Sequence, residues 1–231
     1  MKTPLLLAIG AALLSCMIAP SLAQQELKVR AISFQPGFPV ELHAHLPDGS
    51  ATAGLVEIKT FLNDETNLLK YKGGPLVFTA RSNPVSATDV NQVIGRVEIP
   101  EGVKSCILLF LPEKAEPGNL HSRVMAIDDS QPAFPAGSFK IANFASVQVK
   151  IELEKETFEF ASGEIRVIAK PPFGENKAAS MEAYLKHEDK WQLVSSGSWP
   201  NPGTRRVLQI VIENPETHQL ELKGVRDVVV P

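Results

Sequence analysis

The chain has 231 residues, of which 44% are hydrophobic, and a formal net charge of −3 from 23 basic and 26 acidic side chains. This length is enough to bury one large core or two small ones without disulfides or a metal. A nucleic-acid-binding surface needs a basic excess on one face. The lysines and arginines here are scattered or alternate with glutamates, so we expect no nucleic-acid partner.

Residues 1–23 have the pattern of a secretory signal peptide. Lys2 precedes an apolar run over residues 5–14, and small residues at Ser21 and Ala23 suit cleavage after Ala23. We therefore expect an exported protein, periplasmic or at the cell surface. No later stretch approaches the roughly 20 apolar residues of a membrane span, so we expect no span in the mature chain.

A second interpretation of the same region concerns Cys16. The segment Leu-Leu-Ser-Cys at residues 13–16 resembles a bacterial lipoprotein cleavage box, which would make Cys16 a lipid-anchored N-terminus. The apolar stretch before Cys16 is short and Leu14 is large for such a box. Cleavage after Ala23 is therefore the preferred interpretation.

Most of the remaining sequence alternates apolar and polar residues with a period of two, the pattern of half-buried strands. In residues 147–154 the odd-numbered positions are apolar and the even-numbered ones are polar. Similar runs predict strands over 27–33, 38–46, 54–62, 75–80, 93–99, 103–111, 121–127, 138–143, 164–169, 181–187, 190–195, 205–213, 217–223 and 225–230. Turns rich in Pro and Gly separate these runs and helix is nearly absent, so we expect antiparallel sheets and an all-β fold.

Two histidines in the predicted strand 38–46 are candidate metal ligands. His43 and His45 are two positions apart, so they project from one face about 6.5 to 7 Å apart and could bind a transition metal. His121, His187 and His218 do not form a recognisable ligand spacing with them. The other interpretation is the solvated face of a hairpin that turns at residues 47–49. We therefore expect no metal or other cofactor, with His43 and His45 as the candidate ligands if one binds.

The segment 64–72 is the best helix candidate, because Asp64 could cap one or two turns before Gly73 ends them. The same residues also fit a strand or a loop. Farther along, Cys106 lies in a run that is apolar on both alternating faces, as in a central strand covered on two sides. We expect a buried, unreactive thiol, because a reactive thiolate needs cationic neighbours and this run supplies none.

The number of predicted strands indicates two tandem antiparallel β-sandwiches, since a seven-stranded immunoglobulin-like unit takes roughly 100 residues. We expect an N-terminal domain over residues 24–143 and a C-terminal domain over residues 144–231. The alternation changes at Asn143-Phe144-Ala145, and no flexible linker is visible there, so the units are expected to contact each other. One larger mixed sandwich is the alternative.

Residues 126–168 combine an acidic turn, a Phe-Pro-x-Gly-Ser element, a strand ending at Asn143 and a strand leading to a Ser-Gly-Glu turn. With the continuation over residues 191–212, this pattern resembles uncharacterised secreted bacterial proteins with immunoglobulin-like β-sandwich domains. The likeness covers roughly the last hundred residues. It implies an exported β domain and assigns no catalytic residue.

Trp199, in the turn-rich segment Gly-Ser-Trp-Pro-Asn-Pro-Gly, is the candidate contact for a ligand or partner, because an exposed aromatic could stack on a sugar or anchor a protein. Packing over the end of the sandwich is the ordinary alternative. Trp191 alternates with Leu193 and is expected in the core.

The sequence predicts no catalytic residues. Gly-x-Ser-x-Gly is absent, the acidic turn 128–130 is not followed by a calcium-binding loop, and Glu152 and Glu154 lie on an outward strand face. We expect a noncatalytic cell-envelope protein with a structural or protein-contact role and another envelope protein as partner. The alternative is a carbohydrate- or metal-binding module that serves an envelope enzyme or transporter.

Overall fold

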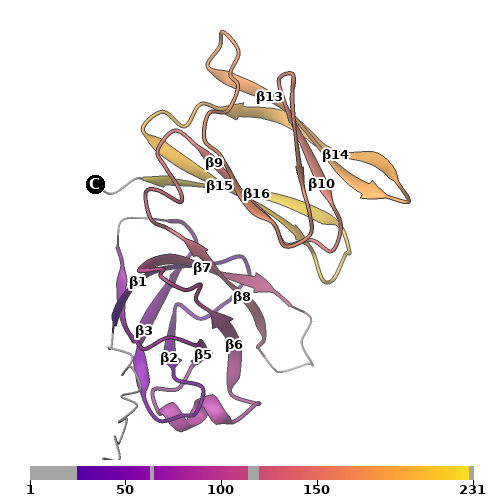
Figure 1. Ribbon diagram of the computed structural model, residues 1–231. Coiled ribbons are helices and arrows are strands. Elements are labelled where there is room, and N and C mark those ends of the chain that lie inside the picture. Colours follow the sequence, from indigo (N-terminus) through magenta and orange to yellow (C-terminus); the bar gives the residue numbers. More distant parts are fainter. Residues whose placement is uncertain (1–24, 63–64, 114–119, 229–231) are drawn as a thin grey trace, which may run out of the picture.

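The computed structural model describes residues 25–62, 65–113 and 120–228 and is built almost entirely of β-strands (Figure 1). The predicted signal peptide, Cys16 and Asp64 lie outside these ranges. A single 3-10 helix, η1 (Pro84–Thr88), occurs in the described part of the chain. None of the helices described there is long and apolar enough to cross a membrane.

The N-terminal lobe is one eight-stranded sheet with the order β6-β5-β2-β3-β1-β7-β8, in which β4 also pairs with β1. Its strands are β1 (Gln25–Ser33), β2 (Glu41–His45), β3 (Thr52–Lys59), β4 (Asn67–Tyr71), β5 (Pro75–Thr79), β6 (Val93–Glu98), β7 (Ser105–Pro112) and β8 (Ser122–Asp128). The sheet curls around an apolar core that includes Leu42, Val56, Phe78, Leu108 and Phe110. The helix candidate 64–72 is therefore wrong over its described part, because β4 pairs antiparallel with β1.

The C-terminal lobe consists of two four-stranded sheets, with the orders β11-β10-β13-β14 and β12-β9-β15-β16. Their strands are β9 (Phe139–Asn143), β10 (Val149–Leu153), β11 (Glu156–Phe160), β12 (Ile165–Ile168), β13 (Ala178–His187), β14 (Lys190–Pro200), β15 (Arg205–Glu213) and β16 (Leu220–Val228). Both sheets contribute to one core, which includes Phe139, Ile151, Met181, Trp199 and Val211. The all-β prediction is confirmed, but the sheets are not purely antiparallel as expected, because β1 pairs parallel with β3 and β7 and β9 pairs parallel with β15. Parts of the predicted runs 217–223 and 225–230 belong to one strand, β16.

The division between the sheets does not coincide with the expected junction at residue 143. β9 precedes that junction but pairs with β12 and β15 of the C-terminal lobe. The change in alternation at 143–145 marks the end of a strand, and the sheet changes earlier, between β8 and β9. Strand 156–160, which the alternation did not predict, is β11 and pairs with β10.

A third apolar cluster joins the two lobes. It contains Ile32, Ile107, Leu109 and Ile127 from the outer face of the N-terminal sheet, and Ala142, Leu208, Ile210 and Val225 from β9, β15 and β16. β7 is therefore covered on both faces, which explains why its sequence is a continuous apolar run. Figure 1 shows β7 and β8 on the side of the N-terminal lobe that faces the C-terminal lobe.

Four buried charges lie beside this interlobe cluster. Arg30 of β1 donates from Nη2 to Oδ1 of Asp129 at 2.7 Å, and from Nη1 to Oδ1 of Asp227 at 2.6 Å. Arg206 of β15 contacts the same two carboxylates and donates from Nη1 to the carbonyl of Phe134 at 2.7 Å. Two cations thus face two anions, so the burial of each charge is offset by a partner on the opposite lobe.

Candidate functional site

The β13/β14 hairpin is the region where the structure departs most from the expected side-chain directions. Its register shifts between Ala183 and Tyr184, because Ser195 pairs with Ala183 while Leu193 pairs with Tyr184. Val194 is therefore an extra residue, a β-bulge, on β14. A bulge of one residue reverses which faces the odd-numbered side chains occupy on its two sides.

The bulge exchanges the expected positions of the two tryptophans. Trp199 is only 6% exposed, and its ring lies 4.9 Å from that of Phe139 in the core of the C-terminal lobe. Trp191 is half-buried and pairs with Lys186 on the outer face of the sheet. The expectation that Trp191 is a core residue is thus wrong, and the candidate contact residue Trp199 offers little surface to a ligand.

Trp191 belongs to a cluster of aromatic and charged side chains on this outer face, which we call the outer cluster: Lys150, Glu152, Glu182, Tyr184 and Trp191. Lys150 Nζ lies 4.0 Å from the centroid of the Tyr184 ring and 5.4 Å from that of Trp191. It also forms an ion pair with Glu152 at 2.5 Å, and the Lys150 side chain is only 14% exposed. The ammonium group thus covers part of both rings through cation–π contacts.

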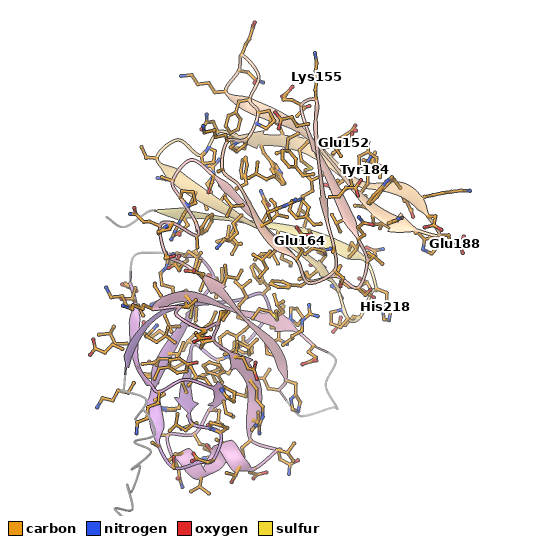
Figure 2. The ribbon with its side chains drawn as sticks, viewed as in Figure 1. Glu152, Lys155, Glu164, Tyr184, Glu188 and His218 are labelled. Carbon is orange, nitrogen blue, oxygen red and sulfur yellow. The ribbon has the colours of Figure 1, made fainter. Side chains whose placement is uncertain are left out.

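A hydroxyl group completes the outer cluster. The Tyr184 hydroxyl donates to Glu182, and this hydrogen bond raises the pKa of Tyr184 to about 12. Figure 2 shows Tyr184 and Glu152 together on this side of the lobe, with Glu188 at the tip of the hairpin. The cluster has aromatic surface and carboxylate acceptors, but Lys150 already pairs with Glu152, and Glu182 already accepts from the Tyr184 hydroxyl.

The outer strand of the hairpin, β14, lies at the end of its sheet and pairs, among the described strands, only with β13. Most of its side chains are exposed, including Leu193 at 50% and Val194 at 43%, whereas Trp199 is buried. Residues 191–200 contain no charged side chain. Figure 1 shows the hairpin extending beyond the rest of the lobe.

The other end strands of this lobe are charged. These residues are Glu156 and Glu159 on β11, Arg166 on β12, and Glu221, Lys223, Arg226 and Asp227 on β16. Charged residues on an end strand prevent it from pairing with a strand of another molecule. β14 has a bulge and a terminal proline, and after Lys190 at its first position it carries no charged residue.

A small cavity of about 140 Å³ lies beside β14, where the two sheets of the lobe leave their edges open. Val194 and Ser195 line it from β14, and Leu220 and Leu222 line it from β16. Both leucines are half-buried against the core of the lobe. The free edge of β14 is thus next to apolar surface.

His45 is buried, although the sequence suggested a solvated position beside His43. Its Nδ1 lies 3.0 Å from Thr52 Oγ1, and its Nε2 lies 3.0 Å from Thr79 Oγ1 and 2.9 Å from the carbonyl oxygen of Arg81. Burial lowers the pKa of His45, and the Arg81 carbonyl partly offsets this shift. β5 and the residues after it cover this face, which the alternation within one strand could not predict.

His43 and His45 remain neighbours on one face, with ring centroids 6.1 Å apart. Within residues 25–62, 65–113 and 120–228, no group of three or more His, Cys, Asp or Glu side chains is placed to hold a metal ion. Because both nitrogens of His45 already have hydrogen-bonding partners, this ring would have to give up a contact to ligate a metal.

Cys106 is fully buried in β7, as its sequence predicted. Burial, with smaller contributions from Asp129 and Asp128, raises the pKa of its thiol to about 12. The turn expected at 128–130 is present, because the Ser130 amide donates to Asp128 Oδ1. The partners of Asp129 are distant in sequence, and no local motif indicated them.

Lys140 is a second buried cation near the lobe interface. Its Nζ donates to the carbonyl of Asp128 at 2.6 Å and lies 5.1 Å from the centroid of the Phe134 ring. Burial lowers the pKa of Lys140 to about 8, although Asp128 and Asp129 oppose the shift.

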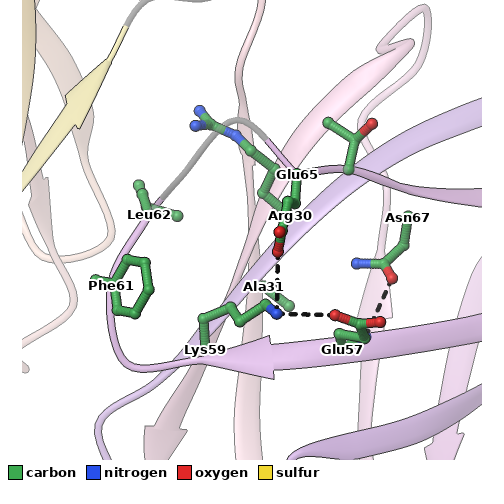
Figure 3. Close-up of a pocket in the computed structure, with 9 residues that line it drawn as sticks. Arg30, Ala31, Glu57, Lys59, Phe61, Leu62, Glu65 and Asn67 are labelled. Atoms are coloured by element: carbon green, nitrogen blue, oxygen red, sulfur yellow. Dashed lines mark hydrogen bonds and ion pairs between the residues drawn. The ribbon is translucent and has the colours of Figure 1, made fainter.

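A polar pocket of about 260 Å³ lies in the N-terminal lobe (Figure 3). Lys59 Nζ lies 2.8 Å from Glu57 Oε2 and 3.1 Å from Glu65 Oε2, and Phe61 also lines the pocket. The two carboxylates raise the pKa of Lys59, which keeps it charged. The lysine is therefore paired and is not available as a general base.

A second pocket, of about 330 Å³, contains a serine, a glutamate and a histidine. The Ser146 hydroxyl donates to Glu213 Oε2 at 3.2 Å, and His218 Nδ1 lies 3.1 Å from Glu213 Oε1. A nucleophilic serine needs the base itself as its hydrogen-bonding partner. Here the serine and the histidine both contact the carboxylate, so the arrangement does not activate the serine.

No protein-family model and no curated protein sequence matches the chain. The chain is similar to a solved "putative cell adhesion protein" from Bacteroides ovatus ATCC 8483, with 8% identity and a TM-score of 0.24 over 90% of this chain and 99% of that one. A second "putative cell adhesion protein", from Parabacteroides distasonis ATCC 8503, is 7% identical with a TM-score of 0.18, over 91% and 99% of the two chains. Scores this low establish neither a shared fold nor a shared function.

Proposed function

We propose that the protein is a noncatalytic, exported component of a bacterial cell envelope that binds a partner protein of the envelope through the free edge of β14. The observation that carries this proposal is the uncharged stretch 191–200 on an exposed end strand. Such a strand presents unpaired backbone groups that can add a strand from a partner. The joined lobes would hold this edge in a fixed position.

The test is affinity capture from an envelope extract with the mature protein and two variants. Ser196→Lys places a charge at an exposed position in the middle of β14, and Thr157→Lys places the same charge at an exposed position on β11, the other end of that sheet. We expect the wild-type protein and Thr157→Lys to retain one defined partner and Ser196→Lys to lose it. Equal capture by all three proteins would contradict the proposal.

A carbohydrate-binding module is the second candidate, and the outer cluster favours it. Tyr184 and Trp191 are half-buried on one sheet face beside the carboxylates of Glu152 and Glu182. A sugar could contact the rings and donate hydroxyl hydrogen bonds to the carboxylates. Saturable binding on a glycan array, abolished by Trp191→Ala and retained by Trp199→Phe, would favour this function over the first.

Metal binding by His43 and His45 is the alternative to our expectation that the protein holds no metal. Titration of the mature protein with zinc or nickel, compared with the His43→Ala/His45→Ala variant, measures it directly. Saturable micromolar binding that is lost in the double variant would favour a metal-binding module.

A further inference from the structure

We infer that the partner strand is β14 of a second copy of this chain, paired antiparallel about a twofold axis; this inference rests on the proposed role of the β14 edge. The pairing would join the two β11-β10-β13-β14 sheets into one continuous sheet across the dimer. An interface of this kind is isologous, because each copy contributes the same surface.

The charge distribution favours a second copy over a different protein. When a strand pairs antiparallel with its own copy, the residue at the twofold axis faces its own counterpart, so a charge at the axis meets a like charge. Residues 191–200 avoid this cost because all ten are uncharged. A strand selected for a different partner has no such restriction and gains specificity from complementary charges.

The other end strands of the lobe are less suited to this role. An antiparallel pair of β11 strands would bring Glu156 and Glu159 close to like charges. β12 carries Arg166, and β16 carries four charged residues of both signs, so β14 has the longest uncharged stretch of these end strands.

The extent of the neutral stretch predicts the position of the axis. In an antiparallel pair about a twofold axis, the residue at the axis faces its own counterpart. We place this residue at Ser196, near the middle of the stretch, so that residues 192–200 of the two copies overlap. The exposed side chains of Leu193 and Val194 then lie within the interface. Their removal from water would stabilise the dimer.

The first experiment measures the mass of the mature protein in solution by sedimentation over a range of concentrations. We expect a monomer–dimer equilibrium for the wild-type protein. Ser196→Lys and Ser196→Glu should each raise the dissociation constant at least about tenfold, because like charges meet at the axis. An equimolar mixture of these two variants should dimerise again, because opposite charges then meet.

Thr157→Lys and Thr157→Glu are the matched controls, since they place the same charges on the other end strand of the same sheet. Both should dimerise with the dissociation constant of the wild type, and mixing the two variants should not change it. A wild-type protein that stays monomeric up to its solubility limit would overturn the inference. So would a dimer that responds to the Thr157 variants and not to the Ser196 variants.

A cross-linking experiment tests the axis itself. Cys106 is buried, so Ser196→Cys adds the one accessible thiol within the described part of the mature chain. Residues that face each other across antiparallel strands lie close enough for a disulfide, so mild oxidation should give a covalent dimer. Thr157→Cys should remain uncross-linked, and equal cross-linking of the two variants would contradict the predicted axis.

These results separate the inference from the proposed function. A monomeric wild type whose capture of a different envelope protein is lost in Ser196→Lys would overturn the inference and leave the proposed function standing. A dimer that Ser196→Lys disrupts, with no other protein captured, would support self-pairing and would show that a different envelope protein is not the partner of the β14 edge.

Discussion

Trp191 and Trp199, which are eight positions apart, show how one inserted residue changes the face on which a side chain lies. Because the bulge at Val194 lies between them, Trp199 is in the core and Trp191 is on the outer face. The chain has two tryptophans, so Trp199→Phe and Trp191→Phe each leave one to observe. We expect iodide to quench the fluorescence of Trp191 in the first variant far more than that of Trp199 in the second.

The same difference should appear in stability. Trp199→Ala should lower the free energy of unfolding by about 3 to 5 kcal/mol, as for other buried aromatics, whereas Trp191→Ala should cost much less. Urea unfolding of both variants measures this difference. Comparable losses of stability in the two alanine variants, or equal quenching of the two tryptophans by iodide, would contradict a bulge at Val194.

Cys106 lies in β7, whose central residues are all buried. Cys106→Ser should destabilise the protein by about 1 to 3 kcal/mol, because the serine hydroxyl is more costly to bury than the thiol. Since folding raises the pKa of the thiol from 9.0 to about 12, the folded state holds this proton more tightly. The thiol's contribution to stability is therefore complete below pH 9 and is lost as the pH rises from 9 towards 12.

Urea unfolding of the wild type and Cys106→Ser between pH 7 and pH 11 measures both effects. The serine variant should show a weaker decline in alkali. A thiol reagent should modify native Cys106 only at the rate of unfolding, and fast modification would contradict the burial of β7.

At the scale of elements, the closure of the N-terminal sheet depends on a glycine. A Cβ atom at Gly95 of β6 would lie 2.4 Å from Val124 Cγ2 and 2.8 Å from the carbonyl oxygen of Ser122, both on β8. Gly95→Ala should therefore destabilise the protein by about 1 to 3 kcal/mol through overpacking. Thermal unfolding measures the loss.

Gly197 of β14 provides the matched control. A Cβ atom there has no neighbour within 4 Å, and its φ angle is not in the left-handed region. Gly197→Ala should therefore be neutral or slightly stabilising, because alanine restricts the unfolded chain. Equal effects at both glycines would mean that β6 and β8 do not meet as described.

At the scale of the whole molecule, the two lobes are joined by an apolar cluster and by paired buried charges. Arg206→Ala leaves Asp129 and Asp227 with one arginine between them. We expect a loss of about 3 to 5 kcal/mol, the usual cost of removing one partner of a buried ion pair. Calorimetry of the wild type should show one transition, because neither lobe can unfold without exposing the shared apolar surface.

Lys59→Ala is the control for this prediction. Lys59 also has two carboxylate partners, but all three side chains are substantially exposed to water. The loss should therefore stay below about 1 kcal/mol. In calorimetry of the wild-type protein, two well-separated transitions would contradict the conclusion that the two lobes unfold together.

The sequence by itself determined the all-β class, the positions of most strands and the burial of Cys106. These properties depend on alternation and turn residues, which act over a few neighbouring positions. Only the tertiary structure decided the faces of Trp191 and Trp199, the burial of His45, the ion cluster of Arg30 and Arg206, and the free edge of β14. Each of these depends on which distant strands pair and in what register, because a shift of one residue exchanges the two faces of a strand.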